Sequence, residues 1–209
     1  MFELMIKGGP LMWFILLASI VALSLFLERL LHLHRAQIDV KAFLNGIYNN
    51  VKRRNFLEAI TICEDTPGPV ARIVQAAILN RDEDESEIRS AMLEAGQMEL
   101  PRLEVNLSWL ATLARVTPLL GLTGTMLGML RTFDIVYLQA PLVQSGDLAH
   151  GLLEAMISSI AGLIVAIPIY CAYNFLVSRV ESIAVDMDSA AWDMLSFLKK
   201  GKDLELIDE

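Results

Sequence analysis

The sequence has few cysteines and little charge for its length. Its 209 residues include 2 cysteines, Cys63 and Cys171, and 20% charged residues against 55% hydrophobic ones. Two cysteines so far apart support neither a disulfide framework nor a paired-cysteine zinc site, and we predict neither a metal nor a cofactor. The net charge of −8 argues against a nucleic-acid partner, because binding to phosphates requires a basic surface.

Charge is absent altogether from three long stretches of the chain. The uncharged runs extend from Leu11 to Leu27, from Val116 to Leu130 and from Ala155 to Ser178. A helix needs about 20 predominantly apolar residues to cross the roughly 30 Å hydrocarbon core of a bilayer. Each run reaches that length with its apolar flanks, although the second requires Arg115 to snorkel or to be paired. We therefore predict an all-α membrane protein with three transmembrane helices and long cytoplasmic helical extensions.

The first uncharged run has a second interpretation, a cleaved signal peptide, because Lys7 precedes it. Glu28 and Arg29 follow the run directly, where a cleavage site needs small residues. An uncleaved membrane helix is therefore favoured.

Basic residues predict the orientation of the three helices. Nine Lys and Arg residues lie between His32 and Arg102, whereas residues 139–150 contain none. Because basic loops remain in the cytoplasm, the N-terminus and the short loop are predicted to be periplasmic and the C-terminus cytoplasmic. The predicted organisation is a periplasmic tail over 1–9, membrane helices over 10–31, 105–135 and 151–178, a periplasmic loop over 136–150, and cytoplasmic helical regions over 32–104 and 179–209.

The two cytoplasmic regions have helical patterns of their own. Apolar residues recur at helical spacing from Val40 to Cys63, and the run from Thr66 to Pro69 ends them. A second helix is predicted from Val70 to Leu79, and a third begins at the acidic residues 82–85 and continues into the second membrane helix. Beyond the third membrane helix, apolar residues recur every three or four positions as far as Leu198, which predicts a helical extension with one apolar face.

Glu154 is an ionisable residue at the start of the third predicted membrane helix. A carboxyl group in that place is unfavourable unless it is paired, hydrated or protonated, so it is a functional candidate. Ser158 follows one turn later on nearly the same face, and Ser159 lies about 140° round the helix. His150, one turn earlier, either forms a proton-exchanging mouth with Glu154 or contacts lipid headgroups from the loop. The alternatives are that Glu154 only satisfies the helix dipole and that the serines only pack.

A stripe of small residues follows one side of the second predicted membrane helix. Its members recur every three or four residues and are Thr117, Gly121, Thr125, Gly128 and Thr132. Small residues allow close helix packing, the role predicted for Gly121, Gly124, Gly128 and, in the third helix, Gly162. The hydroxyl of Thr125 can also hold water or pass a proton, and Thr117, Thr132 and Ser158 are further candidates for the pore or its mouth. Pro168 frees a backbone carbonyl that needs a neighbouring helix or water.

Three segments of the chain match a known family. They are GGPLMWFILLASIVALSLFLERL, TPLLGLTGTMLGMLRTF and GLLEAMISSIAGLIVAIPIYCAYNF. In them the chain resembles the ExbB and TolQ proton-channel subunits, which are related more distantly to MotA, and it is most similar to ExbB. The resemblance places the family's membrane glutamate at Glu154 and its pore threonines at Thr125 and at Ser159, where serine replaces threonine.

The resemblance also implies partners and a function. It implies a homopentamer in the bacterial inner membrane, surrounded by membrane lipids. It further implies an ExbD-like or TolR-like single-span partner with a membrane aspartate, and a TonB-like or TolA-like protein. The implied function is not that of an enzyme: the complex uses the proton motive force to energise TonB-dependent outer-membrane transport.

Three other functions compete with this one. The first is a TolQ-like subunit that powers Tol-Pal envelope constriction, and the short N-terminus and compact length favour the ExbB-like function over it. The second is a non-conducting membrane scaffold that recruits a partner through its acidic helices. The third, a membrane hydrolase using Ser158 or Ser159 with His150, is disfavoured because the sequence offers no oxyanion motif.

Overall fold

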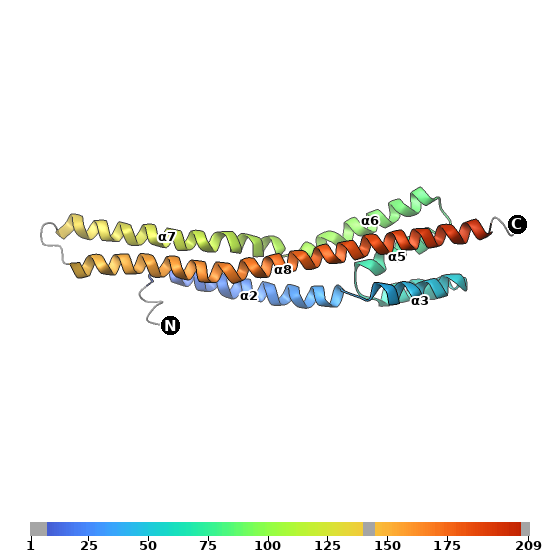
Figure 1. The fold of residues 1–209 in the computed structure, drawn as a ribbon, viewed down its shortest axis with the longest axis horizontal. Coiled ribbons are helices and arrows are strands. Elements are labelled where there is room, and N and C mark those ends of the chain that lie inside the picture. Colours follow the sequence, from blue (N-terminus) through green and yellow to red (C-terminus); the bar gives the residue numbers. More distant parts are fainter. Residues whose placement is uncertain (1–7, 140–144, 206–209) are drawn as a thin grey trace. The chain divides into compact units, whose positions relative to one another are not determined.

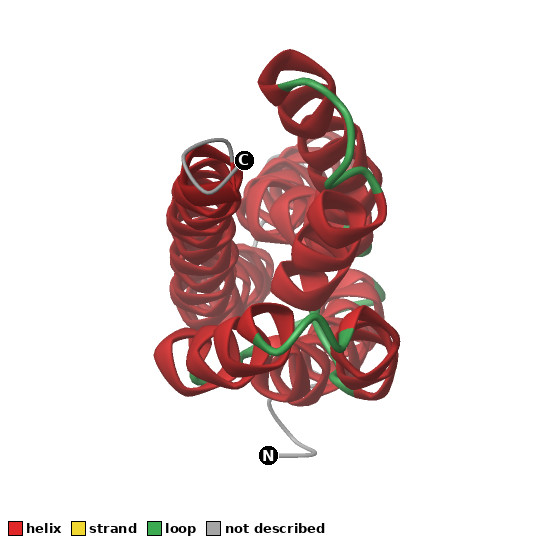
Figure 2. Ribbon diagram, turned by 90° about the vertical axis from the view of Figure 1, so that its right-hand side faces the viewer, coloured by secondary structure: helices red, strands yellow, loops and turns green. Residues whose placement is uncertain are grey.

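The computed structural model describes residues 8–139 and 145–205, and over these residues the chain is helical with no strand (Figure 2). The helices are α2 (Leu11–Ala36), α3 (Val40–Lys52), α4 (Phe56–Asp65), α5 (Pro69–Leu79), α6 (Glu85–Glu104), α7 (Leu107–Gln139) and α8 (Ser145–Glu205) (Figure 1). Three stretches of helix, containing α2, α7 and α8, are long and apolar enough to cross a membrane. The predicted all-α class with three membrane helices is confirmed.

Contacts within the chain define two compact units. The first, here called the membrane unit, comprises residues 1–29 and 106–176, and the second, the extension unit, comprises residues 30–105 and 177–209. The helices α2 and α8 each contribute residues to both units. The predicted helical extension beyond the third membrane helix is present, because α8 is one continuous helix as far as Glu205.

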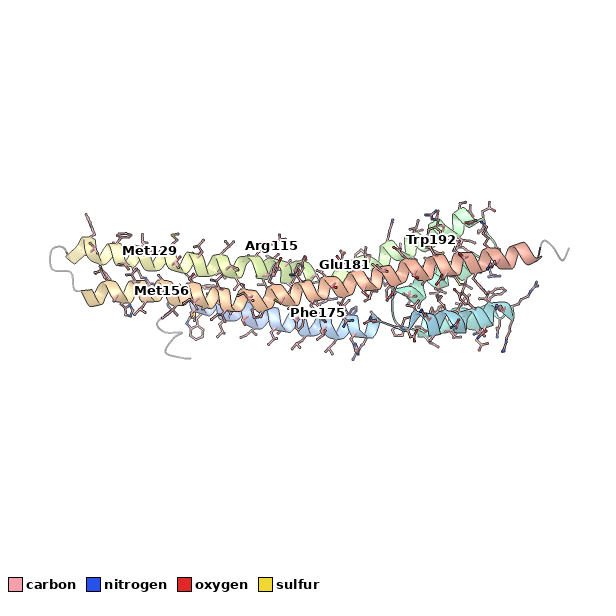
Figure 3. The ribbon with its side chains drawn as sticks, in the orientation of Figure 1. Arg115, Met129, Met156, Phe175, Glu181 and Trp192 are labelled. Atoms are coloured by element: carbon pink, nitrogen blue, oxygen red, sulfur yellow. The ribbon has the colours of Figure 1, made fainter. Side chains whose placement is uncertain are left out.

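The membrane unit has apolar side chains on its outside and small residues between its helices. Met129 on α7 and Met156 on α8 are both exposed, as Figure 3 shows. Other large exposed apolar side chains of this unit are Trp13, Phe14, Leu17, Met126, Leu130, Ile164 and Ile167. A helix exposes such residues without penalty where lipid surrounds it, so this surface is consistent with a membrane-embedded unit.

The extension unit has the opposite arrangement, with an apolar core and charged residues outside. Its fully or nearly fully buried side chains include Leu44, Ile47, Val74, Ile78, Met187 and Met194. Asp39 caps α3 by accepting a hydrogen bond from the Ala42 backbone N–H at 3.1 Å, which satisfies one of the free donors at a helix start. The end of α8 is tied to the other helices by stacking of Tyr48 on Phe197, with ring centroids 4.3 Å apart.

Two breaks interrupt helices that the sequence pattern predicts as continuous. The stretch from Val40 to Cys63 is two helices, because Arg54 has φ 57 and the chain turns between α3 and α4. The predicted continuation of the acidic third helix into the second membrane helix is likewise interrupted, at Asn106 with φ 63. The left-handed backbone region stops an α-helix, and asparagine is among the residues that adopt it most readily.

The range 136–150, assigned to a periplasmic loop from the sequence, is largely helical. The helix α7 extends to Gln139, beyond the predicted end of the membrane helix at 135, and α8 begins at Ser145, before the predicted start of the next one at 151. The connecting residues 140–144 lie outside the described residues, as do residues 1–7 of the predicted periplasmic tail and residues 206–209.

Candidate functional site

Glu154 lies on α8 and forms an ion pair with Arg131 of α7. The two side chains differ in exposure, since that of Glu154 is 12% exposed and that of Arg131 is 52% exposed. A bond from an arginine N–H to a carboxylate is charge-assisted and is among the stronger hydrogen bonds in proteins. The carboxylate is therefore largely covered by the chain, and its counter-charge comes from the neighbouring helix.

Small residues one turn away fix the distance between α7 and α8 at this pair. A Cβ on Gly128 would lie 2.6 Å from the Ala155 Cβ and 2.8 Å from the Gly151 carbonyl oxygen. Gly128 precedes Arg131 by three residues on α7, and Gly151 and Ala155 lie on either side of Glu154 on α8. Because backbones meet here without intervening side chains, the two helices hold the ion-paired groups at short range.

The backbone just before α2 also contacts Glu154. Gly9 has φ +73, and a Cβ at that position would overlap the Glu154 Oε1 and lie 3.1 Å from its carboxyl carbon. Only glycine adopts this backbone conformation without strain and leaves the carboxylate its space. Groups from three parts of the membrane unit therefore surround Glu154: Gly9, Arg131 of α7 and the residues of α8 itself.

The two serines of α8 have different environments. Ser158 is 1% exposed, and its hydroxyl donates to the backbone carbonyls of Glu154 and Ala155 at 3.0 Å each. Its side chain also fills the space where a Cβ on Gly124 would be. Ser159 is half-buried on a different side of α8, and its carbonyl oxygen would lie 3.2 Å from a Cβ on Gly121 of α7. Within one chain, Ser158 therefore packs between helices, and Ser159 keeps part of its surface free.

The threonines of α7 divide in the same way. Thr117 and Thr132 are buried, and their hydroxyls donate to the carbonyls of Leu113 at 2.6 Å and Gly128 at 2.9 Å. Both therefore lie on the packing face of α7. Thr125 is half-buried, and its hydroxyl donates to the Leu122 carbonyl at 2.6 Å. Of the three, Thr125 has the most surface available to a neighbouring chain or to water.

The remaining candidate residues lie around this cluster or follow it on α8. Gly121 and Gly162 meet directly, since a Cβ on Gly162 would lie 2.8 Å from the Gly121 Cα. His150 is exposed on the same helix as Glu154, one turn nearer the start of α8. Pro168 is exposed, and α8 continues through it. Among residues 8–139 and 145–205, no group of three His, Cys, Asp or Glu side chains could hold a metal ion.

Two residues of the site were not singled out from the sequence, Arg131 and Gly9. Arg131 directly follows the uncharged run from Val116 to Leu130, and Gly9 is the last residue of the predicted periplasmic tail. The sequence does contain one indication for Arg131: it follows Gly128, a glycine predicted to pack against another helix, by three residues and therefore lies on nearly the same face of the helix. No local pattern indicated the contact of Gly9 with Glu154, because the two are far apart in the sequence.

Comparison with known proteins identifies the family of the chain. Residues 65–189 match the model of the MotA/TolQ/ExbB proton channel family. The chain belongs to this family. The match contains Glu154, Thr125 and Ser159, and it extends from α4 into the cytoplasmic part predicted for α8. The resemblance predicted from the three sequence segments is thereby confirmed, and with its three membrane-length helices the chain is a multi-pass membrane protein.

Individual relatives of the MotA/TolQ/ExbB family come from several organisms. An ExbB homolog of Methanothermobacter thermautotrophicus is 26% identical over 180 residues, covering 86% of this chain and 63% of the relative. The ExbB protein of Neisseria meningitidis serogroup A is 26% identical over 202 residues, or 90% of each chain. The TolQ protein of Haemophilus influenzae is 37% identical over 111 residues, or 52% of this chain and 48% of TolQ. The chain spans less than two thirds of the archaeal relative, and its relatives carry both ExbB and TolQ names.

Proposed function

We propose that this chain is an inner-membrane proton-channel subunit that uses the proton motive force to energise TonB-dependent outer-membrane transport. The observation that carries the proposal is Glu154, whose side chain is only 12% exposed in a membrane unit that exposes large apolar residues, in a chain of the proton channel family. The match with the ExbB protein of Neisseria meningitidis over 90% of each chain supports an ExbB-like function.

In this proposal Glu154 accepts and releases protons, and Thr125 and Ser159 line the path beside it. A carboxylate can bind one proton and pass it on, and half-buried hydroxyls can hold the water that relays it. One charge that moves through 100 mV releases about 2.3 kcal/mol, enough to bias a conformational cycle. Thr117, Thr132 and Ser158 are assigned to helix packing, because their hydroxyls are buried and donate to backbone carbonyls.

The proposed complex contains five copies of this chain around a smaller partner. The partner is an ExbD-like or TolR-like protein with one membrane span and a membrane aspartate, and a TonB-like or TolA-like protein transmits the work. The N-terminus lies in the periplasm and the C-terminus in the cytoplasm, as the basic residues between His32 and Arg102 favour.

Replacement of Glu154 tests the proposal. The Glu154→Gln variant keeps the size of the side chain and its hydrogen-bonding capacity but removes the titratable group, so proton flux through the complex with its partner is expected to be lost. Flux is measured in vesicles with an internal pH dye under an imposed potential. The matched control is Glu181→Gln, on the same helix and exposed (Figure 3). Wild-type flux in Glu154→Gln would remove Glu154 from the mechanism, whereas absence of flux in the wild-type complex itself would favour a non-conducting scaffold.

A TolQ-like function in Tol-Pal envelope constriction is the second candidate, and the identity to TolQ of Haemophilus influenzae supports it. Complementation separates the two. A strain that lacks its own ExbB and TolQ is expected to recover growth on TonB-dependent nutrients when it expresses this chain with its partner, and to remain detergent-sensitive. Recovery of detergent resistance alone would assign the chain to the Tol-Pal system.

A further inference from the structure

We propose that Arg131 and Gly9 form a cap over Glu154 that closes the proton pathway at rest, with Arg131 as a positioning residue. This inference rests on the proposed function of Glu154 as the proton carrier. It adds a resting state of the site and names the two groups that maintain it.

The first support is the charge arrangement. The Arg131 guanidinium keeps its charge at all physiological pH values and is bonded to a carboxylate that is only 12% exposed. Protonation of Glu154 would leave Arg131 beside a neutral group and break the charge-assisted bond. The ion pair therefore favours the ionised form of Glu154, and proton uptake becomes more favourable when Arg131 moves away, so the pair acts as a latch.

The second support is the position of Gly9. Its backbone lies beside the same Glu154 Oε1 atom that Arg131 bonds, and it approaches so closely that a Cβ on Gly9 would overlap this oxygen. This contact is independent of charge. Together the two groups cover the carboxylate from α7 and from the segment before α2, which explains why so little of Glu154 is exposed.

The third support is that the ion pair is held by tight packing rather than by mobile side chains alone. Gly128 meets Ala155 and Gly151 at distances that leave no room for a methyl group. Arg131 and Glu154 each follow one of these contacts by three residues. A change in the spacing of α7 and α8 would therefore separate the pair, which gives the cap a defined way to open.

Carboxyl labelling tests the cap without reference to conduction. The full-length protein in vesicles is treated with a membrane-permeant carbodiimide, and modification of Glu154 is followed by mass spectrometry. The Arg131→Gln variant is expected to react roughly tenfold faster than wild type, the change given by loss of about 1.4 kcal/mol of protection. Arg131→Lys keeps the charge and is expected to restore protection. The matched control Arg115→Gln, exposed on the same helix (Figure 3), is expected to react as wild type does.

Gly9 is tested by the same labelling. Gly9→Ala places a methyl group where the carboxylate lies, so either the chain before α2 or Glu154 is displaced and labelling accelerates. The control is Gly146→Ala, because a Cβ at Gly146 meets nothing within 4 Å. An unchanged labelling rate in both Arg131→Gln and Gly9→Ala, with an unchanged elution volume, would overturn the cap.

Proton leak through the subunit assembly without its partner connects the cap to the pathway. Arg131→Gln is expected to leak more than wild type, and the double variant Arg131→Gln with Glu154→Gln is expected to return to the wild-type leak. An equal leak in the single and double variants would show that Arg131 does not act through Glu154 and would overturn the latch. Faster labelling of Arg131→Gln together with normal flux in Glu154→Gln would instead keep the cap and reject the proposed function.

Discussion

The ion pair of Arg131 and Glu154 joins a covered carboxylate to a half-exposed arginine. Removal of one member of a fully buried pair costs about 3–5 kcal/mol, whereas an exposed pair contributes about 0–1 kcal/mol. The Arg131 side chain is 52% exposed and lies four residues before the predicted end of its membrane helix, where water can screen its charge, so the stability contribution lies nearer the exposed limit. Variants at Arg131 are therefore expected to fold, and their effects on labelling and leak report on the site.

Cys63 illustrates how burial controls reactivity at a single residue. It is completely buried in α4, and burial, assisted by the charge of Glu64, raises the pKa of its thiol to about 12. The thiolate is the reactive form, so Cys63 is expected to stay unmodified by maleimide at pH 8 in the folded protein. Because Cys171 is exposed, the experiment uses a Cys171→Ser background, in which labelling is expected only after denaturation, as measured by intact mass.

The matched control for Cys63 places a thiol on the exposed side of the same helix. Leu57 is 82% exposed, so Leu57→Cys in a background with both Cys63→Ser and Cys171→Ser is expected to react within minutes under the same conditions. Because burial raises the pKa of Cys63, the protonated thiol contributes fully to the stability of the folded protein below pH 9. This contribution is lost as the pH rises towards about 12. Rapid labelling of native Cys63 at pH 8 would contradict its burial.

The helices could be predicted from the sequence to different degrees. The three membrane helices and the helical extension of α8 follow from uncharged runs and from apolar spacing, which are strong signals over many residues. The breaks at Arg54 and Asn106 depend on the backbone conformation of single residues. The spacing of apolar residues does not detect such a change in one residue. The ends of α7 and α8 near residues 139 and 145 were missed because polar residues can continue a helix that packs on a neighbour.

The turn between α6 and α7 depends on Asn106, which gives a prediction for these elements. Its φ of 63 lies in the left-handed region, where a β-branched side chain is strained by roughly 1–2 kcal/mol. Asn106→Val is therefore expected to lower the free energy of unfolding by about that amount. The measurement is thermal unfolding in detergent, followed by circular dichroism.

Glycine at the same position is the control. Asn106→Gly loses the weak hydrogen bond that the Asn106 side chain donates to Glu28 at 3.5 Å, but it keeps the backbone conformation available. It is expected to be nearer to wild type than Asn106→Val. Equal stability of the valine and glycine variants would show that the left-handed turn does not limit the connection of α6 to α7.

Within the whole molecule, the candidate site was predictable only in part. Glu154 is conspicuous in the sequence because it is an ionisable group at the start of an apolar run, whereas the pore roles of Thr125 and Ser159 are implied by the family resemblance. The partners of Glu154 are not conspicuous, because the bond of Arg131 to Glu154 joins residues 23 positions apart and the contact of Gly9 joins residues still further apart. Such contacts depend on which faces of α7 and α8 meet. In the folded chain these faces contain the glycines that let the two helices pack closely.

The two units are stabilised by different physical effects, and this distinction can be tested. The membrane unit packs through small residues and is apolar outside, whereas the extension unit buries residues such as Met194 away from water. Met194→Ala leaves a cavity in the extension unit and is expected to cost about 2–5 kcal/mol of its stability. Hydrogen exchange is therefore expected to rise in residues 30–105 and 177–200 and to stay unchanged in residues 107–139 and 148–176.

The control for this cavity variant is Val185→Ala on the same helix, because Val185 is 67% exposed and its truncation leaves no cavity. A surface substitution of this kind changes stability by about 0.5 kcal/mol at most, so its exchange pattern is expected to match wild type. An equal rise in exchange across both units of Met194→Ala would mean that they unfold as one cooperative structure. A rise confined to the extension unit would mean that the site around Glu154 has its own stability, maintained by the glycine contacts of α7 and α8 and by the surrounding lipid.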